Sequence, residues 1–151
     1  MRRSEKGTAM KTETVIETRY PDCDRMGIVH HAVYPVWYEM ARMDLFAAVG
    51  FSFEDMNRLG VNPAMVDLHL QYRATATYPQ KLTVTASVGF VAPKKLELLY
   101  ETSDETGRVI NTCRSFHIWT GPDNRSYDLA ANLPEVYAKF AAASEEGLGE
   151  R

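Results

Sequence analysis

The sequence predicts an α+β fold in which an antiparallel sheet wraps around one long helix. Residues 11–20 alternate as a strand does, residues 32–49 carry an apolar helical pattern, and four more strand-like runs lie between residues 66 and 120. The turns between those runs are too short for parallel crossovers, so the strands are expected to be antiparallel. A helix that is apolar on most faces needs a sheet that covers it.

The length of 151 residues favours a single domain with a real core. Residues 1–10 are polar and irregular, and we expect them to be disordered. Residues 11–143 are expected to form the domain, and residues 144–151 a flexible tail. The first strand is predicted over Lys11 to Tyr20, with one face made by Thr14, Ile16, Thr18 and Tyr20.

The long helix is predicted from Ala32 to Val49, because apolar residues recur there with a period near 3.6. Gly50 suits the left-handed position that follows a helix. Glu39 and Arg42 have the i,i+3 spacing of an ion pair on the remaining polar face. The apolar stripe consists of Val33, Val36, Trp37, Met40, Ala41, Leu45 and Ala48.

The remaining elements follow from capping and alternation signals. Ser52 and Asp55 resemble a capping box, which predicts a short helix that ends at Gly60. Leu133 to Ala143 is predicted as a last helix, with Pro134 in its first turn. Alternating apolar residues predict strands over residues 66–73, 81–90, 95–101 and 108–120, which completes a sheet of five strands.

Composition excludes several classes of protein. The net charge of −3 gives no reason to expect a nucleic acid or an anionic membrane surface as the partner. The chain has no run of about 20 apolar residues, so no membrane span is predicted. Its basic start lacks the apolar run of a signal peptide. Cys23 and Cys113 form no CxxC pattern, and we expect free thiols in a reducing cytoplasm.

The stretch from Arg19 to Tyr34 holds most of the reactive side chains. Two carboxylates, one thiol and two imidazoles fall within ten residues, in a turn that leads into a helix N-terminus. A helix N-terminus offers unpaired backbone N–H groups and the positive end of the dipole. A carboxylate beside such donors suggests acyl transfer or hydrolysis. The alternative is structural, because Asp is common in Asx-turns, and Asp22 is expected to play that part.

No metal and no cofactor are predicted. The spacing of Asp22, Cys23, Asp24, His30 and His31 fits no zinc pattern. Among these residues, Asp24 is the first catalytic candidate, as general base or as nucleophile. The His31 imidazole is the second candidate, because it could polarise water or orient Asp24.

The turn and the helix together carry a longer motif. It runs Asp22-Cys23-Asp24-x-x-Gly27-Ile28-Val29-x-His31-x-x-Tyr34 and then Trp37-Tyr38-Glu39-x-Ala41-Arg42. This motif resembles the hotdog-fold acyl-CoA thioesterases of the 4-hydroxybenzoyl-CoA thioesterase type, and especially the YbgC-like branch. The resemblance implies a catalytic role for Asp24 and a backbone N–H near His31 that holds the thioester carbonyl. It also implies that Lys94 and Lys95 contact CoA phosphates across a dimer.

Four further residues are candidates for substrate binding. Gly27 is expected to supply a positive φ or a close approach in the turn, and Ala32 a second N–H at the helix start. Tyr34 and Trp37 are candidates for lining an acyl pocket, although aromatic residues on a central helix are more often core.

The predicted partner is an acyl-CoA, or an acyl-carrier-protein thioester. Uncovered edge strands predict a homodimer, and the resemblance implies a homotetramer, with Val91 and Leu99 available for a second interface. Two other functions stay open. One is a hotdog-fold hydratase that acts on an enoyl thioester, and the other is a non-catalytic acyl-CoA-binding module.

Overall fold

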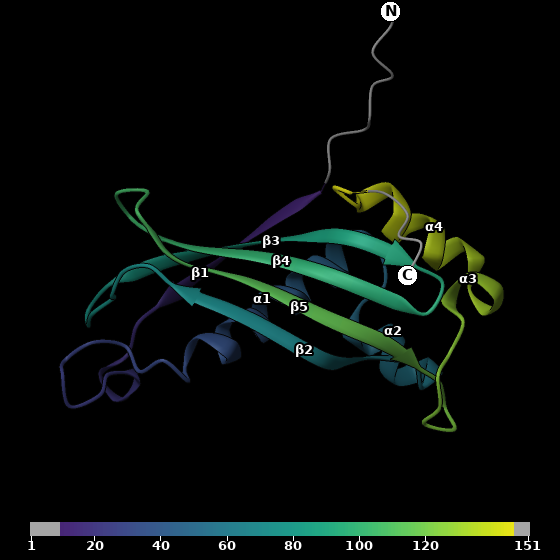
Figure 1. Cartoon of the computed structure of the whole chain (residues 1–151), viewed down its shortest axis with the longest axis horizontal. Helices are drawn as coiled ribbons and strands as arrows, with labels where there is room; N and C mark the ends of the chain where they lie inside the picture. Colours follow the sequence, from purple (N-terminus) through teal and green to yellow (C-terminus); the bar gives the residue numbers. More distant parts are fainter. Residues whose placement is uncertain (1–9, 147–151) are drawn as a thin grey trace, which may run out of the picture.

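A curved sheet of five antiparallel strands covers one long helix, α1, in the computed structural model, which describes residues 10–146 (Figure 1). The predicted α+β class is therefore confirmed. The strand order is β1-β3-β4-β5-β2, which leaves β1 and β2 as the two edges. The strands are β1 (Lys11–Glu17), β2 (Asn62–Tyr72), β3 (Lys81–Ala92), β4 (Lys95–Asp104) and β5 (Val109–Thr120).

The helices differ from prediction mainly at their ends. The long helix begins at Tyr34 rather than Ala32, and a four-residue helix after β5 was too short to predict from periodicity. The predicted capping box is confirmed, because Ser52 Oγ accepts the Asp55 N–H and Asp55 accepts the Ser52 N–H, both at 3.1 Å. The helices are α1 (Tyr34–Val49), α2 (Phe53–Leu59), α3 (Leu129–Asn132) and α4 (Pro134–Ala143).

One face of α1 forms the centre of the core, and the opposite face is open in the single chain. Trp37, Ala41 and Leu45 are buried against the sheet. Val36 and Met40, predicted to share that buried stripe, are 59% and 45% exposed. The prediction was wrong there because the apolar residues of α1 cover more of its circumference than one sheet can bury.

The first strand ends at Glu17, three residues before the predicted end at Tyr20, because the Asp22 side chain binds Arg19 and turns the backbone away from the sheet. The buried Asp22 carboxylate accepts the Arg19 N–H at 2.8 Å and pairs with the Arg19 guanidinium at 3.0 Å. Residues Tyr20–Asp22 form a 3₁₀ turn (η1) on this anchor. Tyr20 consequently turns outward and is 78% exposed, contrary to the predicted strand face.

The edge strand β2 is largely exposed in the single chain. Met65 and Val66 are 41% and 59% exposed, and Val66 is the residue left out of the pairing with β5 where the register shifts between Met65 and Asp67. Val91, predicted as an interface residue, is wholly buried near an irregularity in β3 and cannot serve an exposed interface. Leu99 is half-buried.

The end of the described chain lies beside β3. The N–H groups of Glu145 and Glu146 donate to the carbonyls of Val88 and Gly89, each at 2.9 Å. The expected disorder of residues 1–10 and flexibility of residues 144–151 fall mostly on segments outside the described residues. Within residues 10–146, no helix has the length and apolar character needed to cross a membrane.

Candidate active site

Asp24 stands in a tight turn that its own groups build. Asp24 Oδ1 accepts the Met26 N–H at 2.8 Å, and the Asp24 carbonyl accepts the Gly27 N–H at 3.0 Å. Gly27 has φ of +76°, as predicted, which an L side chain adopts only with strain. Asp24 is therefore the Asx-turn residue, whereas Asp22, predicted for that role, anchors Arg19. Asp24 Oδ2 has no hydrogen-bond partner among residues 10–146, so one oxygen of this half-exposed carboxylate is available.

Of the two donors predicted at the helix start, the N–H groups of His31 and Ala32, one is open. The Ala32 N–H donates to His30 Nδ1 at 3.0 Å, so that donor is already engaged. No hydrogen bond within the described part of the chain involves the His31 N–H. The exposed His31 ring stacks on His30 with a centroid distance of 4.2 Å, and its carbonyl accepts the Tyr72 hydroxyl at 2.6 Å.

Tyr34 and Trp37 pack in the core. Their side chains are 2% and 6% exposed, and their rings meet edge-on at 5.2 Å. Burial raises the pKa of Tyr34 to about 12. Both residues are therefore part of the core, and neither lines the pocket described next.

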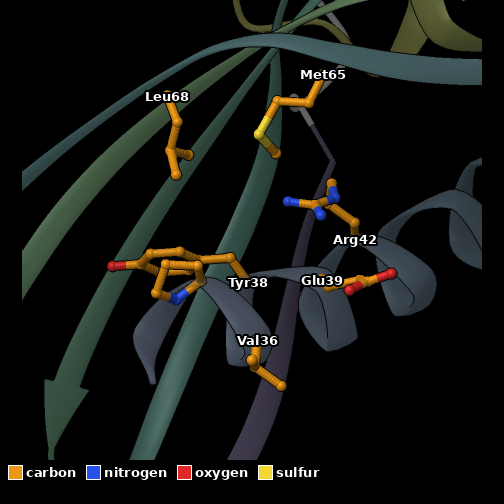
Figure 2. Close-up of a pocket in the computed structure, with 7 residues that line it drawn as sticks. Val36, Tyr38, Glu39, Arg42, Met65 and Leu68 are labelled. Atoms are coloured by element: carbon orange, nitrogen blue, oxygen red, sulfur yellow. The ribbon is translucent and has the colours of Figure 1, made fainter. Parts of the chain in front are cut away.

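A pocket of about 230 Å³ lies between the first turns of α1 and the edge strand β2 (Figure 2). The predicted ion pair between Glu39 and Arg42 does not form within this structure. In Figure 2 the Arg42 guanidinium points toward Met65, while the Glu39 carboxylate points away from it. The lining residues are Pro35, Val36, Tyr38, Glu39, Arg42, Met65 and Leu68.

Lys94 and Lys95 lie at the far end of the sheet from Asp24. Lys94 lies in the turn between β3 and β4, and Lys95 is the first residue of β4. The turn that holds Asp24 follows β1, whose last residue, Glu17, pairs with Lys81 at the start of β3 (Figure 1). The 12 residues of β3 separate the two ends. A strand of that length spans roughly 40 Å. Within one chain, these lysines and Asp24 cannot contact the same CoA headgroup.

A chain of buried polar groups, which sequence analysis missed, runs inward from Arg42. Arg42 donates to the Tyr100 hydroxyl at 3.2 Å, and Tyr100 lies 2.8 Å from Ser115 Oγ. Ser115 Oγ lies 2.7 Å from His117 Nε2, and His117 Nδ1 lies 3.1 Å from the Pro63 carbonyl. The available signal was the period of two along β5, which places Ser115 and His117 on the same inward face as Cys113 and Trp119.

The chemistry of these groups gives the chain one direction. The Pro63 carbonyl can only accept, so His117 Nδ1 carries the proton. Burial lowers the pKa of His117 to about 4, so the ring is neutral near pH 7 and Nε2 accepts from Ser115. Ser115 then accepts from Tyr100. Burial raises the pKa of Tyr100, so its phenol remains a donor, and its oxygen accepts from Arg42.

The fold and this arrangement define a member of a known class of proteins. Residues 18–143 match the model of the Thioesterase-like superfamily, and the chain belongs to that superfamily. Among solved structures, the DHNA-CoA thioesterase from Staphylococcus aureus superposes with a TM-score of 0.81 at 29% identity, covering 86% of this chain and 88% of that one. The protein TT1821 from Thermus thermophilus gives 0.80 at 26% identity, covering 87% and 98%. The predicted hotdog fold is confirmed.

A curated relative matches over a shorter stretch. The Bacillus subtilis protein named "Putative acyl-CoA thioesterase YneP" is 41% identical over 69 residues, which are 46% of this chain and 50% of that protein. The chain spans about half the length of the curated relatives it matches.

Proposed function

We propose that this protein is an acyl-CoA thioesterase of the YbgC-like branch, which hydrolyses an acyl-CoA to a carboxylic acid and CoA. The observation that carries the proposal is the free Oδ2 of Asp24 in a turn that leads to the open N–H of His31. The superfamily and the thioesterase names of the relatives support it.

In this proposal a thioester needs little help with its leaving group, because a thiolate leaves readily. The protein supplies a base or nucleophile and a donor for the oxyanion. As general base, Asp24 takes a proton from water, and the hydroxide adds to the carbonyl carbon. The C–S bond then breaks, and the CoA thiolate takes up the proton from Asp24. As nucleophile, Asp24 forms an anhydride as the C–S bond breaks and CoA thiolate leaves, and water then hydrolyses the anhydride. The His31 N–H holds the oxyanion in either route, and one such donor typically contributes about 10²–10³ in rate.

We also propose a homodimer that joins two β2 edges, because edge strands with exposed apolar residues need covering. A two-fold axis beside β2 reverses the partner's strands. The partner's turn between β3 and β4 then lies at the same end as Asp24 of this chain. Lys94 and Lys95 of one subunit would thereby contact the CoA phosphates of a ligand in the other subunit's site. The homotetramer implied by the family resemblance also remains a proposal. Of the two residues predicted for its second interface, Val91 is buried and Leu99 is half-buried.

The central experiment measures thiol release from short, medium, long and aromatic acyl-CoAs. Asp24→Asn is expected to lose at least about 100-fold in kcat/KM. The matched control is Asp123→Asn, because Asp123 Oδ1 also accepts an N–H two residues ahead, at 3.1 Å from Arg125 N, in an exposed turn at the other end of the sheet. Full activity in Asp24→Asn would overturn the assignment of Asp24 as base or nucleophile. A loss of kcat/KM in Glu39→Gln instead would assign that role to Glu39, the carboxylate that lines the pocket.

The same assay separates the two alternatives. Loss of the enoyl absorbance of crotonyl-CoA without thiol release would favour the hydratase. Binding of acyl-CoA by the parent protein and by Asp24→Asn, without turnover in either, would favour the binding module. The free thiols of Cys23 and Cys113 agree with the proposed cytoplasmic location.

A further inference from the structure

Arg42 places a cation in the pocket without a counter-ion. None of the ion pairs among residues 10–146 involves Arg42, and its one hydrogen-bond partner there is the Tyr100 hydroxyl. Glu39 is the one carboxylate that lines the pocket, and it points away from Arg42 (Figure 2). The guanidinium therefore keeps several donors for another partner.

The walls around Arg42 make an anion the partner that fits. Val36, Met65 and Leu68 are apolar, and such walls strengthen an electrostatic interaction compared with water. A guanidinium presents its N–H groups in a planar fork that matches a carboxylate in a bidentate pair.

The buried polar chain holds Arg42 in place for such a pair. Because the chain ends on the Pro63 carbonyl, each hydroxyl in it has a fixed direction, and the Tyr100 oxygen is left as an acceptor for Arg42. This contact orients one Arg42 nitrogen toward the protein and leaves the other nitrogens free. Pro63 belongs to β2, the same strand that supplies Met65 and Leu68 to the pocket wall.

We propose that Arg42 binds a carboxylate at the far end of a short acyl group, so that monothioesters of small dicarboxylic acids are the preferred substrates. This inference rests on the proposed thioesterase function. The pocket of about 230 Å³ is smaller than the usual range of roughly 300–1,000 Å³ for drug-sized ligands, which favours a short acyl group. Arg42 is the specificity residue, and Tyr100 is a positioning residue.

The test compares glutaryl-CoA with valeryl-CoA, which have the same number of acyl carbons and differ at the terminal group. The parent protein is expected to favour glutaryl-CoA in kcat/KM by about 10–100-fold, the size of a charge-assisted hydrogen-bonded pair. Arg42→Gln is expected to remove that preference, and Arg42→Lys to keep part of it. Arg58→Gln is the matched control, because Arg58 lies on α2 and pairs with Asp55 at the surface.

Two further measurements separate binding from general damage to the fold. Tyr100→Phe removes one hydroxyl and is expected to raise KM for glutaryl-CoA without a matching rise for valeryl-CoA, whereas a merely structural loss moves both substrates together. Free glutarate is expected to raise the Tm of the parent protein but not of Arg42→Gln, and the neutral valeramide, which carries no carboxylate, to raise neither. This second readout does not depend on turnover.

Each of the other outcomes of these measurements overturns one part of the proposal. Equal kcat/KM for the two thioesters, or an unchanged preference in Arg42→Gln, overturns the role of Arg42. A preference for 4-hydroxybenzoyl-CoA over benzoyl-CoA that depends on Arg42, without one for glutaryl-CoA, overturns the choice of a carboxylate. Loss of the dimer in Arg42→Gln assigns Arg42 to a subunit contact instead. No hydrolysis of any acyl-CoA overturns the proposed function, while the glutarate measurement still tests the Arg42 site.

Discussion

Ser115 Oγ lies 2.7 Å from His117 Nε2, the spacing of a serine nucleophile and its base, yet both side chains are closed off from solvent. Ser115 is 0% exposed and His117 is 2% exposed. A nucleophile must reach a substrate carbon, and this one cannot. The pair therefore belongs to the structure that supports Arg42 rather than to the reaction.

Ser115→Ala is accordingly expected to keep turnover within about tenfold, whereas loss of a true serine nucleophile costs about 10⁶. The substitution leaves a buried acceptor, His117 Nε2, without its donor, so it is expected to lower the free energy of unfolding by about 1–3 kcal/mol. Thiol release and urea denaturation measure the two quantities. Complete loss of activity in a folded Ser115→Ala protein would contradict this interpretation.

The neutral state of His117 predicts how stability changes with pH. The unfolded chain takes up a proton at the ordinary pKa of 6.5, but the folded protein does so only near a pKa of about 4. The unfolded state thus binds more protons between these values. The free energy of unfolding is expected to fall as the pH drops from 6.5 toward 4, by about 3 kcal/mol from this residue, and then to level off.

Because carboxylates also titrate in the lower part of that range, the measurement compares two pH profiles. His117→Gln keeps a polar side chain but does not titrate. The profile of the parent protein minus that of the variant is expected to show the fall between pH 6.5 and 4, and a flat difference would argue against a neutral buried imidazole.

The two acids of the Asp-x-Asp turn are expected to fail in different ways. Asp22→Asn replaces a buried carboxylate that accepts from the Arg19 N–H and guanidinium, and is expected to cost about 1–2 kcal/mol of stability because its charge-assisted hydrogen bonds are weakened while the exposed Arg19 guanidinium stays solvated. Asp24→Asn leaves an amide oxygen that can still accept the Met26 N–H, and is expected to cost less than about 1 kcal/mol. Urea denaturation of the two variants tests the contrast, and equal losses would contradict it.

Two glycines separate backbone strain from steric conflict. A Cβ on Gly27 meets nothing within 4 Å, so Gly27→Ala is expected to cost only the strain of its positive φ, about 1 kcal/mol. A Cβ on Gly89 would clash with Glu97 Oε1, and Glu97 is 1% exposed with that oxygen unpaired in the described structure. Gly89→Ala is therefore expected to be clearly the more damaging, as measured by Tm.

The sequence predicted those features of the fold that depend on interactions between residues close together in the chain. The Ser52 capping box, the end of α1 at Gly50 and the short turns depend on neighbouring residues, and the sequence was sufficient for them. The exposed face of α1 and the buried Val91 depend on how many faces one sheet can cover and on an irregularity in β3, which no short pattern encodes. The hydrogen-bonded series from Arg42 to His117 joins residues up to 75 positions apart in the sequence. Its members therefore look like unrelated polar residues until the sheet brings them together.

The placement of Lys94 and Lys95 predicts a site shared between subunits. The double variant Lys94→Gln/Lys95→Gln is expected to raise KM for acyl-CoA by about tenfold or more through lost phosphate contacts, and to leave KM for a short thioester without the nucleotide largely unchanged.

A mixed dimer is the sharper test. When an Asp24→Asn chain pairs with a Lys94→Gln/Lys95→Gln chain, one site receives both lesions and the other receives none. Such mixed dimers, isolated with two different affinity tags, are expected to recover about half of the parent activity per dimer at low acyl-CoA concentration. If each site were built from a single chain, every site in the mixed dimer would carry a lesion, and the activity would stay near the mean of the two variant homodimers.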